Sequence, residues 1–313
     1  MNRTRLAPSP TGALHLGNAR TFLLTWLWAR ARGAEVVMRV EDLDGPRVKR
    51  GAVEEALEDL RWLGLDWDGE VLFQSPRAAV YEDALARLRA AGRVYPCVCT
   101  RQEIEAAASA PNEGDEGPPY PGTCRGRFAS ADDAERATGR TPAWRFRVDE
   151  AARAFDDGVL GLVTRDLARD GGDFVVAKKT GEAAYQLAVV VDDAAQGVTD
   201  VIRGDDLVPS TPRQLLLFEA LGLPAPRFAH LPLVRGEDGR RLAKRHGDTR
   251  LSHYRALGVR PERVVGLLAA WSGLGARAAV AARDLVGDFD LARLPRGDVT
   301  FHAADDRWLL GAG

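Results

Sequence analysis

The segment from Thr4 to Val40 constrains the fold of this chain more than any other. Residues 4–7 form a short segment that leads into a loop rich in proline and glycine. Residues 18–32 then place apolar side chains at three- and four-residue steps, which predicts a helix, and Gly33 follows where that helix is expected to end. Residues 36–40 have the composition of a buried strand. This order predicts an α/β fold with a Rossmann-like, doubly wound parallel sheet.

The α/β pattern resumes in the second half of the chain. We expect strands at residues 187–191 and 201–204, followed by a helix from about Thr211. The predicted helix start has Thr211 as N-cap, Pro212 at the first helical position and Gln214 completing a capping box.

The patterns divide the chain into four expected segments. Residues 97–184 contain a stretch rich in glycine, proline and acidic residues, which predicts an insertion between two halves of the sheet, residues 1–96 and 185–250. Residues 251–313 are mostly helical by pattern, so a short helical C-terminal region is expected.

The composition is that of an ordinary globular protein, with 45% hydrophobic and 28% charged residues. No run approaches the ~20 apolar residues of a membrane span, and the N-terminus lacks a signal peptide's apolar core. We therefore expect a cytoplasmic protein without membrane partners. The net charge of −2 argues against a nucleic-acid coat protein, although the basic run at 235–245 could contact phosphates or be a solvated loop.

The three cysteines, Cys97, Cys99 and Cys124, form an odd, clustered set. In a cytoplasmic chain such a set indicates metal binding or reactivity rather than disulfides. Three thiolates favour a tetrahedral zinc site, but no histidine lies between them, so the fourth ligand could be Tyr120, a carboxylate or water. Three cysteines without a metal are the alternative.

The loop before the first predicted helix ends in His15, Gly17 and Asn18. A helix N-terminus with unpaired N–H groups attracts phosphate, Gly17 permits close approach, and His15 could donate to a phosphoryl oxygen. A surface histidine at a helix cap is the plainer interpretation. No Gly-x-x-x-x-Gly-Lys loop is present here, which excludes a P-loop site.

Several segments together resemble the glutamyl-tRNA synthetase family of class I aminoacyl-tRNA synthetases, in the family's order and spacing over roughly residues 3–250. They are residues 5–18, similar to the HIGH signature with its flanks, then 38–44, 191–193, 201–207 and 210–214, and 241–245, similar to the KMSKS loop.

This resemblance implies ATP-dependent activation of L-glutamate to glutamyl-adenylate, with Mg²⁺ accompanying ATP. The planar guanidinium group of arginine can bind each of the two substrate carboxylates through two hydrogen bonds, and an acidic side chain can pair with the substrate ammonium group. The family's glutamate pocket corresponds to Arg5, Ser9, Glu41, Tyr185 and Arg203. The ATP site corresponds to His15, Gly17, Asn18 and Lys244, of which His15, Gly17 and Lys244 are the implied catalytic residues.

The chain departs from the family pattern in two places. In the KMSKS-like loop Arg241 replaces the usual first lysine and Ala243 the usual serine, but Lys244 remains, so we expect activity to survive. Val189 stands where full-length glutamyl-tRNA synthetases typically have asparagine, four residues after Tyr185. An apolar residue there predicts a rearranged glutamate pocket.

The Cys-x-Cys…Tyr-x-x-x-Cys spacing resembles the zinc motif of a short branch of the family, the glutamyl-queuosine tRNA(Asp) synthetases. It implies one zinc per chain on Cys97, Cys99, Tyr120 and Cys124. Residues 246–313 leave no room for an anticodon-binding domain, which we expect to be absent. The branch implies a monomer that activates glutamate without tRNA and transfers it to the queuosine base in the anticodon of tRNA(Asp).

Two alternatives remain. A truncated glutamyl-tRNA synthetase would charge the 3′ end of tRNA(Glu). An inactive nucleotide- or tRNA-binding paralogue would bind without catalysis, although the retention of His15, Glu41, Arg203 and Lys244 argues against it.

Overall fold

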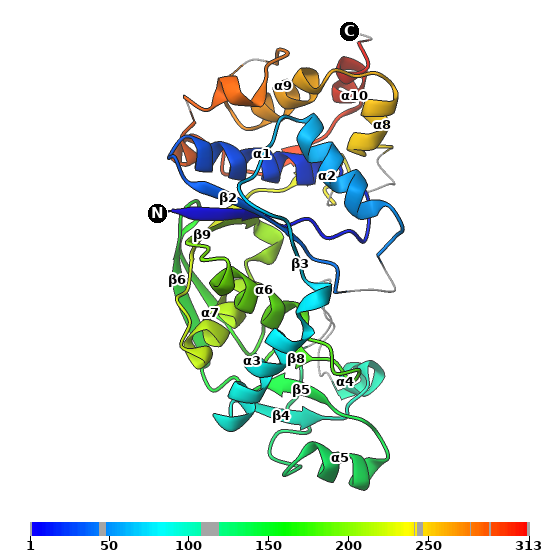
Figure 1. Cartoon of the computed structure of the whole chain (residues 1–313), viewed down its shortest axis with the longest axis vertical. Coiled ribbons are helices and arrows are strands. Elements are labelled where there is room, and N and C mark those ends of the chain that lie inside the picture. The colour runs from blue at the N-terminus through cyan, green and yellow to red at the C-terminus, as the bar shows by residue number, and fades with distance from the viewer. Residues whose placement is uncertain are drawn as a thin grey trace.

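The computed structural model describes residues 2–43, 48–107, 119–240, 242, 247–275, 277–287 and 289–311. Strands with mostly parallel pairing cross the middle of the molecule (Figure 1). One group, in spatial order, is β1 (Arg3–Leu6), β2 (Glu35–Val40) and β3 (Leu72–Phe73). The other is β7 (Gly161–Asp166), β6 (Ala152–Asp157), β10 (Arg227–Leu231) and β9 (Asp200–Gly204).

The two groups meet where β1 lies beside β9. The Thr199 N–H donates to the Arg3 carbonyl over 2.9 Å, at the start of both strands. In β9 and β10, Arg203 pairs with His230 in the parallel register. In an open α/β sheet, ligands bind outside the carboxyl ends of the strands, so the site is expected at the ends of β1, β2 and β9.

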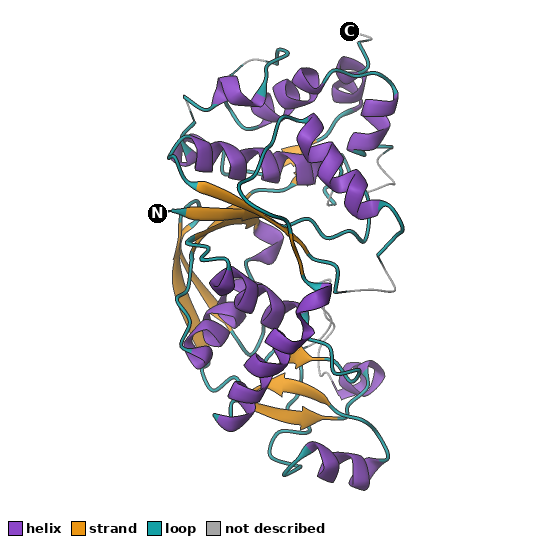
Figure 2. Ribbon diagram, viewed as in Figure 1, coloured by secondary structure: helices purple, strands orange, loops and turns teal. Residues whose placement is uncertain are grey.

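Helices cover both faces of this sheet (Figure 2). Neighbouring residues of a strand point to opposite faces, and Val201 and Ile202 of β9 accordingly pack into different cores. The core around Ile202 contains α1 (Leu16–Arg30), α2 (Ala52–Trp62) and α9 (Pro261–Trp271). The core around Val201 contains α3 (Ala78–Ala90), α6 (Tyr185–Ala195) and α7 (Ser210–Leu221).

A separate antiparallel sheet lies at the end of the molecule opposite the C-terminus (Figure 1). Its small core contains Tyr95, Cys97, Tyr120 and Cys124. The sheet consists of β4 (Val94–Cys97), β5 (Ala143–Phe146) and β8 (Phe174–Ala177), and α4 (Arg101–Ala107) and α5 (Ala131–Thr138) lie near it.

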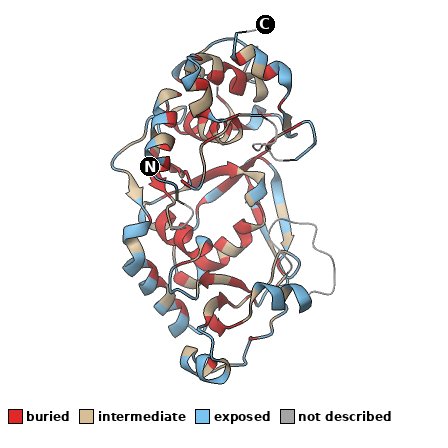
Figure 3. Cartoon of the chain, turned by 90° about the vertical axis from the view of Figure 1, so that its right-hand side faces the viewer, coloured by how far each residue is buried: buried red, intermediate tan, exposed pale blue. Residues whose placement is uncertain are grey.

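The C-terminal part adds short elements over α1. They are β11 (Val234–Arg235), β12 (Val299–Thr300), α8 (Leu251–Ala256) and α10 (Ala303–Leu309), with single-turn 3₁₀ segments at Ala282–Leu285 and Leu291–Arg293. Two further 3₁₀ turns lie elsewhere, at Ser75–Arg77 before α3 and at Asp205–Leu207 after β9. Buried residues concentrate in the central sheet and the helices packed on it (Figure 3). Among the described helices, none has both the length and the apolar character needed to cross a membrane.

Two local predictions are wrong. Residues 187–191 lie in the helix α6, not in a strand, because a short apolar run has the same pattern in a buried strand and in a helix buried on most sides. Thr211 is not an N-cap, since α7 already begins at Ser210 and its cap residue, Pro209, makes no side-chain cap bond. The strands predicted at 4–7, 36–40 and 201–204, the first helix and the helical tail around residues 264–271 are confirmed.

Candidate active site

A cavity of about 470 Å³ opens at the carboxyl ends of β1, β2 and β9, within the usual size range of ligand sites. The loop before α1 and the start of α6 complete its walls. Eight predicted site residues line it: Arg5, Ser9, His15, Gly17, Asn18, Glu41, Tyr185 and Arg203. The ninth, Lys244, lies outside the described residues.

His15 is the N-cap of α1, and its ring folds back onto the helix start. Its Nδ1 accepts the Gly17 N–H over 3.1 Å and the Asn18 N–H over 3.4 Å, while Asn18 Oδ1 accepts the His15 N–H over 3.3 Å. A Cβ at Gly17 would lie 2.9 Å from His15 Cε1, so a glycine is needed to seat the ring. With Nδ1 as acceptor, the neutral ring carries its proton on Nε2, where it can donate to a phosphoryl oxygen.

The expectation of unpaired N–H groups at this helix start is wrong for the first three residues. Leu16 N–H donates to the Thr249 carbonyl over 3.0 Å, and the next two donate to His15. The backbone has taken internal acceptors because buried N–H groups are costly without them. An anion bound here would therefore meet the His15 ring and the helix dipole.

Arg203 is a buried cation, 4% exposed, held by neutral acceptors. Its Nε donates to His230 Nε2 over 3.1 Å, Nη1 to Gln214 Oε1 over 2.8 Å, and Nη2 to Thr211 Oγ1 over 2.8 Å and the Leu207 carbonyl over 3.3 Å. Within the part of the chain that the structure describes, no carboxylate forms an ion pair with it. Burial lowers the pKa of Arg203 to about 10, so the side chain stays charged at neutral pH.

Thr211 and Gln214 therefore have a different role from the predicted capping box. Both side chains are buried and face Arg203 rather than the start of α7. The Gln214 amide in turn donates to Gln186 Oε1 over 2.9 Å, and Gln186 donates to Ser210 Oγ over 2.9 Å. This chain of amides fixes the orientation of the Arg203 acceptors.

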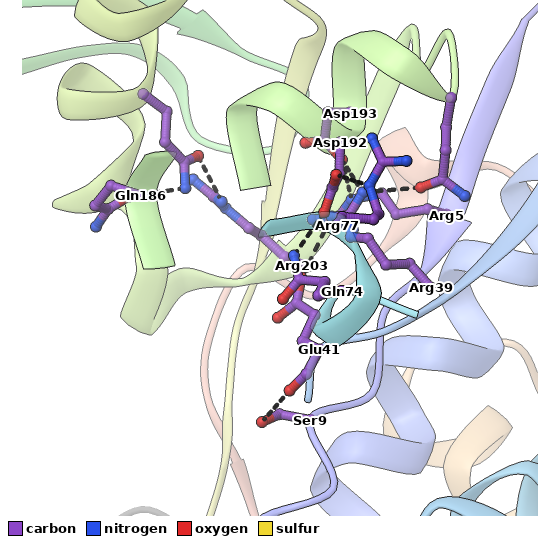
Figure 4. Close-up of polar contacts among 12 residues, drawn as sticks. Arg5, Ser9, Arg39, Glu41, Gln74, Arg77, Gln186, Asp192, Asp193 and Arg203 are labelled. Atoms are coloured by element: carbon purple, nitrogen blue, oxygen red, sulfur yellow. Dashed lines mark hydrogen bonds and ion pairs between the residues drawn. The ribbon is translucent and has the colours of Figure 1, made fainter. Parts of the chain in front are cut away.

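Arg5 has a separate set of contacts; in Figure 4 it lies to the right of Arg203, and Gln186 lies to the left. Its Nε is 3.6 Å from Asp193 Oδ1 and its Nη1 donates to the Ile202 carbonyl over 3.4 Å, both long contacts. The same Asp193 oxygen accepts a 2.7 Å bond from Arg39 Nη1. Asp193 is therefore paired mainly with Arg39. Arg5 still has N–H groups with which it could bind a ligand in the cavity that it lines.

Glu41 is one of two acidic residues that line the cavity; the other is Asp206. Its Oε1 accepts from Arg39 Nη2 over 3.3 Å, and Ser9 Oγ donates to the Glu41 carbonyl over 3.4 Å. Burial raises the pKa of the Glu41 carboxyl, and the nearby arginines Arg39 and Arg5 oppose that rise only in part. Tyr185, the first residue of α6, is 40% exposed at the cavity wall. The cavity is therefore lined by two cations, Arg5 and Arg203, and by two carboxylates, Glu41 and Asp206.

The cysteines come together in the antiparallel sheet, far from this cavity. The three Sγ atoms lie within 4.8 Å of one another, and Tyr120 Oη lies 3.3 Å from Cys97 Sγ and 3.6 Å from Cys99 Sγ. The Tyr120 oxygen also accepts the Cys124 N–H over 2.8 Å. Arg145 covers the Tyr120 ring at 3.8 Å and donates to Cys97 Sγ over 3.3 Å. This cluster could hold a metal ion.

Comparison with known proteins identifies the family. The family described as "tRNA synthetases class I (E and Q), catalytic domain" matches residues 1–303. A glutamyl-Q tRNA(Asp) synthetase of Symbiobacterium thermophilum is 52% identical, over 96% of this chain and 95% of that protein. The chain belongs to the glutamyl-Q tRNA(Asp) synthetases, a group of class I tRNA synthetases.

Relatives that charge tRNA are more distant. A glutamate–tRNA ligase of Heliobacterium modesticaldum is 40% identical, over 99% of this chain and 64% of that protein. The crystal structure of a glutamate-tRNA synthetase from Elizabethkingia anophelis matches with a TM-score of 0.82 at 27% identity, covering 98% of this chain and 69% of that one. This likeness confirms the predicted Rossmann-like α/β fold.

From the sequence, no role was assigned to three residues that contact the arginines of the synthetase site or their partners: Asp157, Asp193 and His230. Of these, only Asp193 lies in a segment that carries the family resemblance. An ionisable residue inside an apolar strand, such as His230 between Ala229 and Leu231, was the available signal. Val189 is 1% exposed in α6 and is not among the residues lining the cavity, so its effect on the glutamate pocket stays a prediction.

Proposed function

We propose that this synthetase activates L-glutamate with ATP, without tRNA, and transfers the glutamyl group to the queuosine base in the anticodon of tRNA(Asp). The observation that carries the glutamate assignment is Arg203, a buried cation whose partners are all neutral among the described residues and which lines the cavity. Burying an unpaired charge is costly, so the site favours a ligand that brings a carboxylate.

Glutamate fits the distribution of charge in the cavity. Arg203 and Arg5 would bind its two carboxylates, and Glu41 in the same cavity would pair with the ammonium group. Ser9 and Tyr185 add hydroxyl groups at the same wall. Glutamine would leave a cation unpaired, since its amide carries no charge.

The activation step is attack by a glutamate carboxylate oxygen on the α-phosphorus of ATP. The new P–O bond forms as the bond from the α-phosphorus to the bridging oxygen breaks, and pyrophosphate leaves with that electron pair. Donors and cations that meet the developing charge lower this barrier. His15 would donate to the phosphate, Gly17 and Asn18 hold the ring and the loop, and Lys244 would neutralise the departing pyrophosphate. Mg²⁺ bound with ATP would supply further positive charge.

The acceptor is inferred from the relatives named for tRNA(Asp), which are 45–53% identical, against 40–41% for glutamate–tRNA ligases. An unpaired anticodon-loop base can be splayed out and inserted into a pocket. Charging of the 3′ end of tRNA(Glu) is the second candidate, supported by the fold match to glutamate-tRNA synthetase.

The decisive experiment measures two reactions of the purified chain. Glutamate, but not glutamine or aspartate, should support ATP–pyrophosphate exchange with no tRNA present. Labelled glutamate should then pass to tRNA(Asp) that carries queuosine, and not to queuosine-free tRNA(Asp) or to tRNA(Glu). Stable charging of tRNA(Glu) would overturn the acceptor assignment, and absence of exchange would overturn the activation step.

Zinc is the metal we propose for the cysteine cluster. The cluster offers four donor atoms, the sulfurs of Cys97, Cys99 and Cys124 and the phenol oxygen of Tyr120, which lies next to the first two sulfurs. Four such donors suit a tetrahedral Zn²⁺ ion. Protein purified without chelator should contain about one zinc per chain, and Cys99→Ser should lose most of it while glutamate-dependent exchange largely survives. Zinc-free protein with unchanged stability would refute the site.

We also propose that the synthetase acts as a monomer in the cytoplasm. The segments expected from the sequence, 1–96, 97–184, 185–250 and 251–313, are proposed as its first catalytic half, zinc-bearing insertion, second catalytic half and helical tail. Sedimentation velocity would test the monomer, because a dimer would sediment as a species of twice the mass.

A further inference from the structure

His230 lies behind Arg203, away from the cavity. It is fully buried on β10, directly beside Arg203 in the parallel register, and it is not among the cavity-lining residues. Its two ring nitrogens contact different partners: Nε2 lies 3.1 Å from Arg203 Nε and 3.1 Å from Thr211 Oγ1, and Nδ1 lies 2.6 Å from Asp157 Oδ2. The ring therefore connects a carboxylate on β6 with the guanidinium on β9.

Asp157 has its two oxygens in distinct environments. Oδ1 accepts three backbone N–H groups, from Val159 over 3.0 Å, Leu160 over 2.9 Å and His230 over 3.1 Å. Oδ2 faces the His230 ring. Burial raises the pKa of Asp157, but the bonds from His230, Leu160 and Val159 outweigh burial and hold it below its ordinary value. Asp157 is therefore a carboxylate at neutral pH.

His230 is neutral, because burial and the charge of Arg203 lower its pKa despite the bond to Asp157. A neutral ring carries one proton, and the carboxylate at 2.6 Å places that proton on Nδ1. Nε2 then has a lone pair, which accepts the Arg203 Nε–H. The other tautomer would protonate Nε2 and leave the Arg203 Nε–H without this acceptor.

We propose that Asp157 and His230 are positioning residues for glutamate binding: Asp157 fixes the His230 tautomer, and His230 orients Arg203 without neutralising it. This inference rests on the proposed role of Arg203. A carboxylate in direct contact with Arg203 would compete with the substrate for the guanidinium. The neutral imidazole holds the Nε–H, while the positive charge remains for the substrate carboxylate.

Asp157→Asn tests the tautomer directly. The amide oxygen must take the Oδ1 position, since three N–H groups point at it, and the NH₂ group then faces His230 Nδ1. The ring proton moves to Nε2, where it can donate to Thr211 Oγ1, and the Arg203 Nε–H loses its acceptor. The KM for glutamate in ATP–pyrophosphate exchange should rise about tenfold or more, with the KM for ATP nearly unchanged. Nitrogen-15 NMR should show the His230 ring protonated on Nε2 instead of Nδ1.

Two substitutions of His230 form a matched pair. His230→Gln can keep an acceptor near the Nε2 position, whereas His230→Asn keeps a polar group near Nδ1 and loses the acceptor for Arg203. The Asn variant should therefore have the larger increase in glutamate KM, by about tenfold over the Gln variant. Equal KM values for the two variants, at equal thermal stability, would overturn the positioning role. If Asp157→Asn does not fold, the comparison of the two His230 variants still tests whether His230 positions Arg203.

Arg203→Ala separates this inference from the proposed function. If exchange in Arg203→Ala is unimpaired, the glutamate pocket itself is wrong. If Arg203→Ala is impaired while folded Asp157→Asn has the glutamate KM of the unsubstituted protein, the pocket stands and the positioning pair is refuted.

Discussion

Arg39 on β2 and Arg203 on β9 are both buried beside the cavity, but in opposite electrostatic environments. Arg39 donates to Asp193 over 2.7 Å and to Glu41 over 3.3 Å, and these carboxylates raise its pKa above the ordinary value despite complete burial. Arg203 has neutral acceptors, and burial lowers its pKa. The same residue type thus has its charge neutralised by the chain at one position and not at the other.

This difference separates a structural cation from a binding cation. A buried charge with its counter-charge in place stabilises the arrangement around it, whereas one with neutral partners gains most when a ligand brings the counter-charge. Position matters as well as pairing. Arg20 is also buried, donates to Ser272 and the Pro232 carbonyl, and has a pKa lowered to about 10, but it does not line the cavity. A cation is a candidate for substrate binding when it reaches the cavity and the chain leaves its charge without a close counter-charge, as at Arg203 and, with its long 3.6 Å contact to Asp193, at Arg5.

The largest expected effect is on stability at Arg39. Arg39→Met would leave the buried Asp193 carboxylate without its closest cation, and breaking a buried pair costs about 3–5 kcal/mol. Urea unfolding should show this loss. Arg5→Met is the matched control, because its 3.6 Å contact with Asp193 is long and its removal should cost much less. An equal decrease in the free energy of unfolding in Arg39→Met and Arg5→Met would contradict the distinction between structural and substrate-binding arginines.

The next largest effect is on glutamate affinity at Arg203. Arg203→Met should weaken glutamate binding by at least about 2 kcal/mol, or roughly 30-fold, because a substrate carboxylate loses its partner. Its free energy of unfolding should fall less than in Arg39→Met, since no carboxylate is left unpaired among the described residues. Isothermal titration with glutamate and urea unfolding measure the two quantities. A larger stability loss than in Arg39→Met would make Arg203 a structural residue.

Arg145 extends the comparison to the cysteine cluster. A zinc ion on three thiolates and a phenolate carries net negative charge, and Arg145 is the cation in contact with both Cys97 and Tyr120. Arg145→Met should weaken zinc binding by about 10- to 100-fold, the usual effect of removing a residue that contacts metal ligands. Competition with a chromophoric chelator measures this. Arg145→Lys keeps the positive charge but loses the planar contact with the Tyr120 ring, so its zinc affinity should lie between those of Arg145→Met and the unsubstituted protein. An unchanged zinc affinity in Arg145→Met would exclude this role for Arg145.

Much of the fold was predictable because local patterns and tertiary structure agree. The first strand, loop, helix and second strand have distinct periodicities, and the carboxyl ends of parallel strands meet at one edge. Arg5, Glu41 and Arg203 therefore converge although they are far apart in sequence.

Predictions failed where a local pattern had a second explanation. The apolar run at 187–191 is equally compatible with strand and buried helix, and only packing decides between them. Thr211 and Gln214 have the spacing of a capping box, but their side chains bind Arg203 from the neighbouring strand. The contact between Asp157 and His230 joins residues 73 positions apart, and no local pattern indicates it.

The smallest expected effect concerns Asp59, a buried anion with incomplete pairing. It lies on α2, and neither of its carboxylate oxygens has a hydrogen-bond partner in the described part of the chain, although Arg255 approaches to 3.3 Å. Burial raises the pKa of Asp59 to about 7, with Arg255 opposing the rise and Glu55 and Glu58 adding to it. The folded state therefore favours the protonated form.

The raised pKa of Asp59 determines how the stability of the protein depends on pH. A carboxyl whose pKa is higher in the folded than in the unfolded state destabilises the fold progressively as pH rises from about 4 to about 7. Asp59→Asn removes that penalty, so its stability relative to the unsubstituted protein should be greater at pH 8 than at pH 5, by about 1–2 kcal/mol in urea unfolding. Glu58→Gln is the control, because Glu58 is exposed and pairs with the same Arg255. A pH-independent effect of Asp59→Asn would mean that Arg255 already neutralises this carboxylate, as Asp193 does for Arg39.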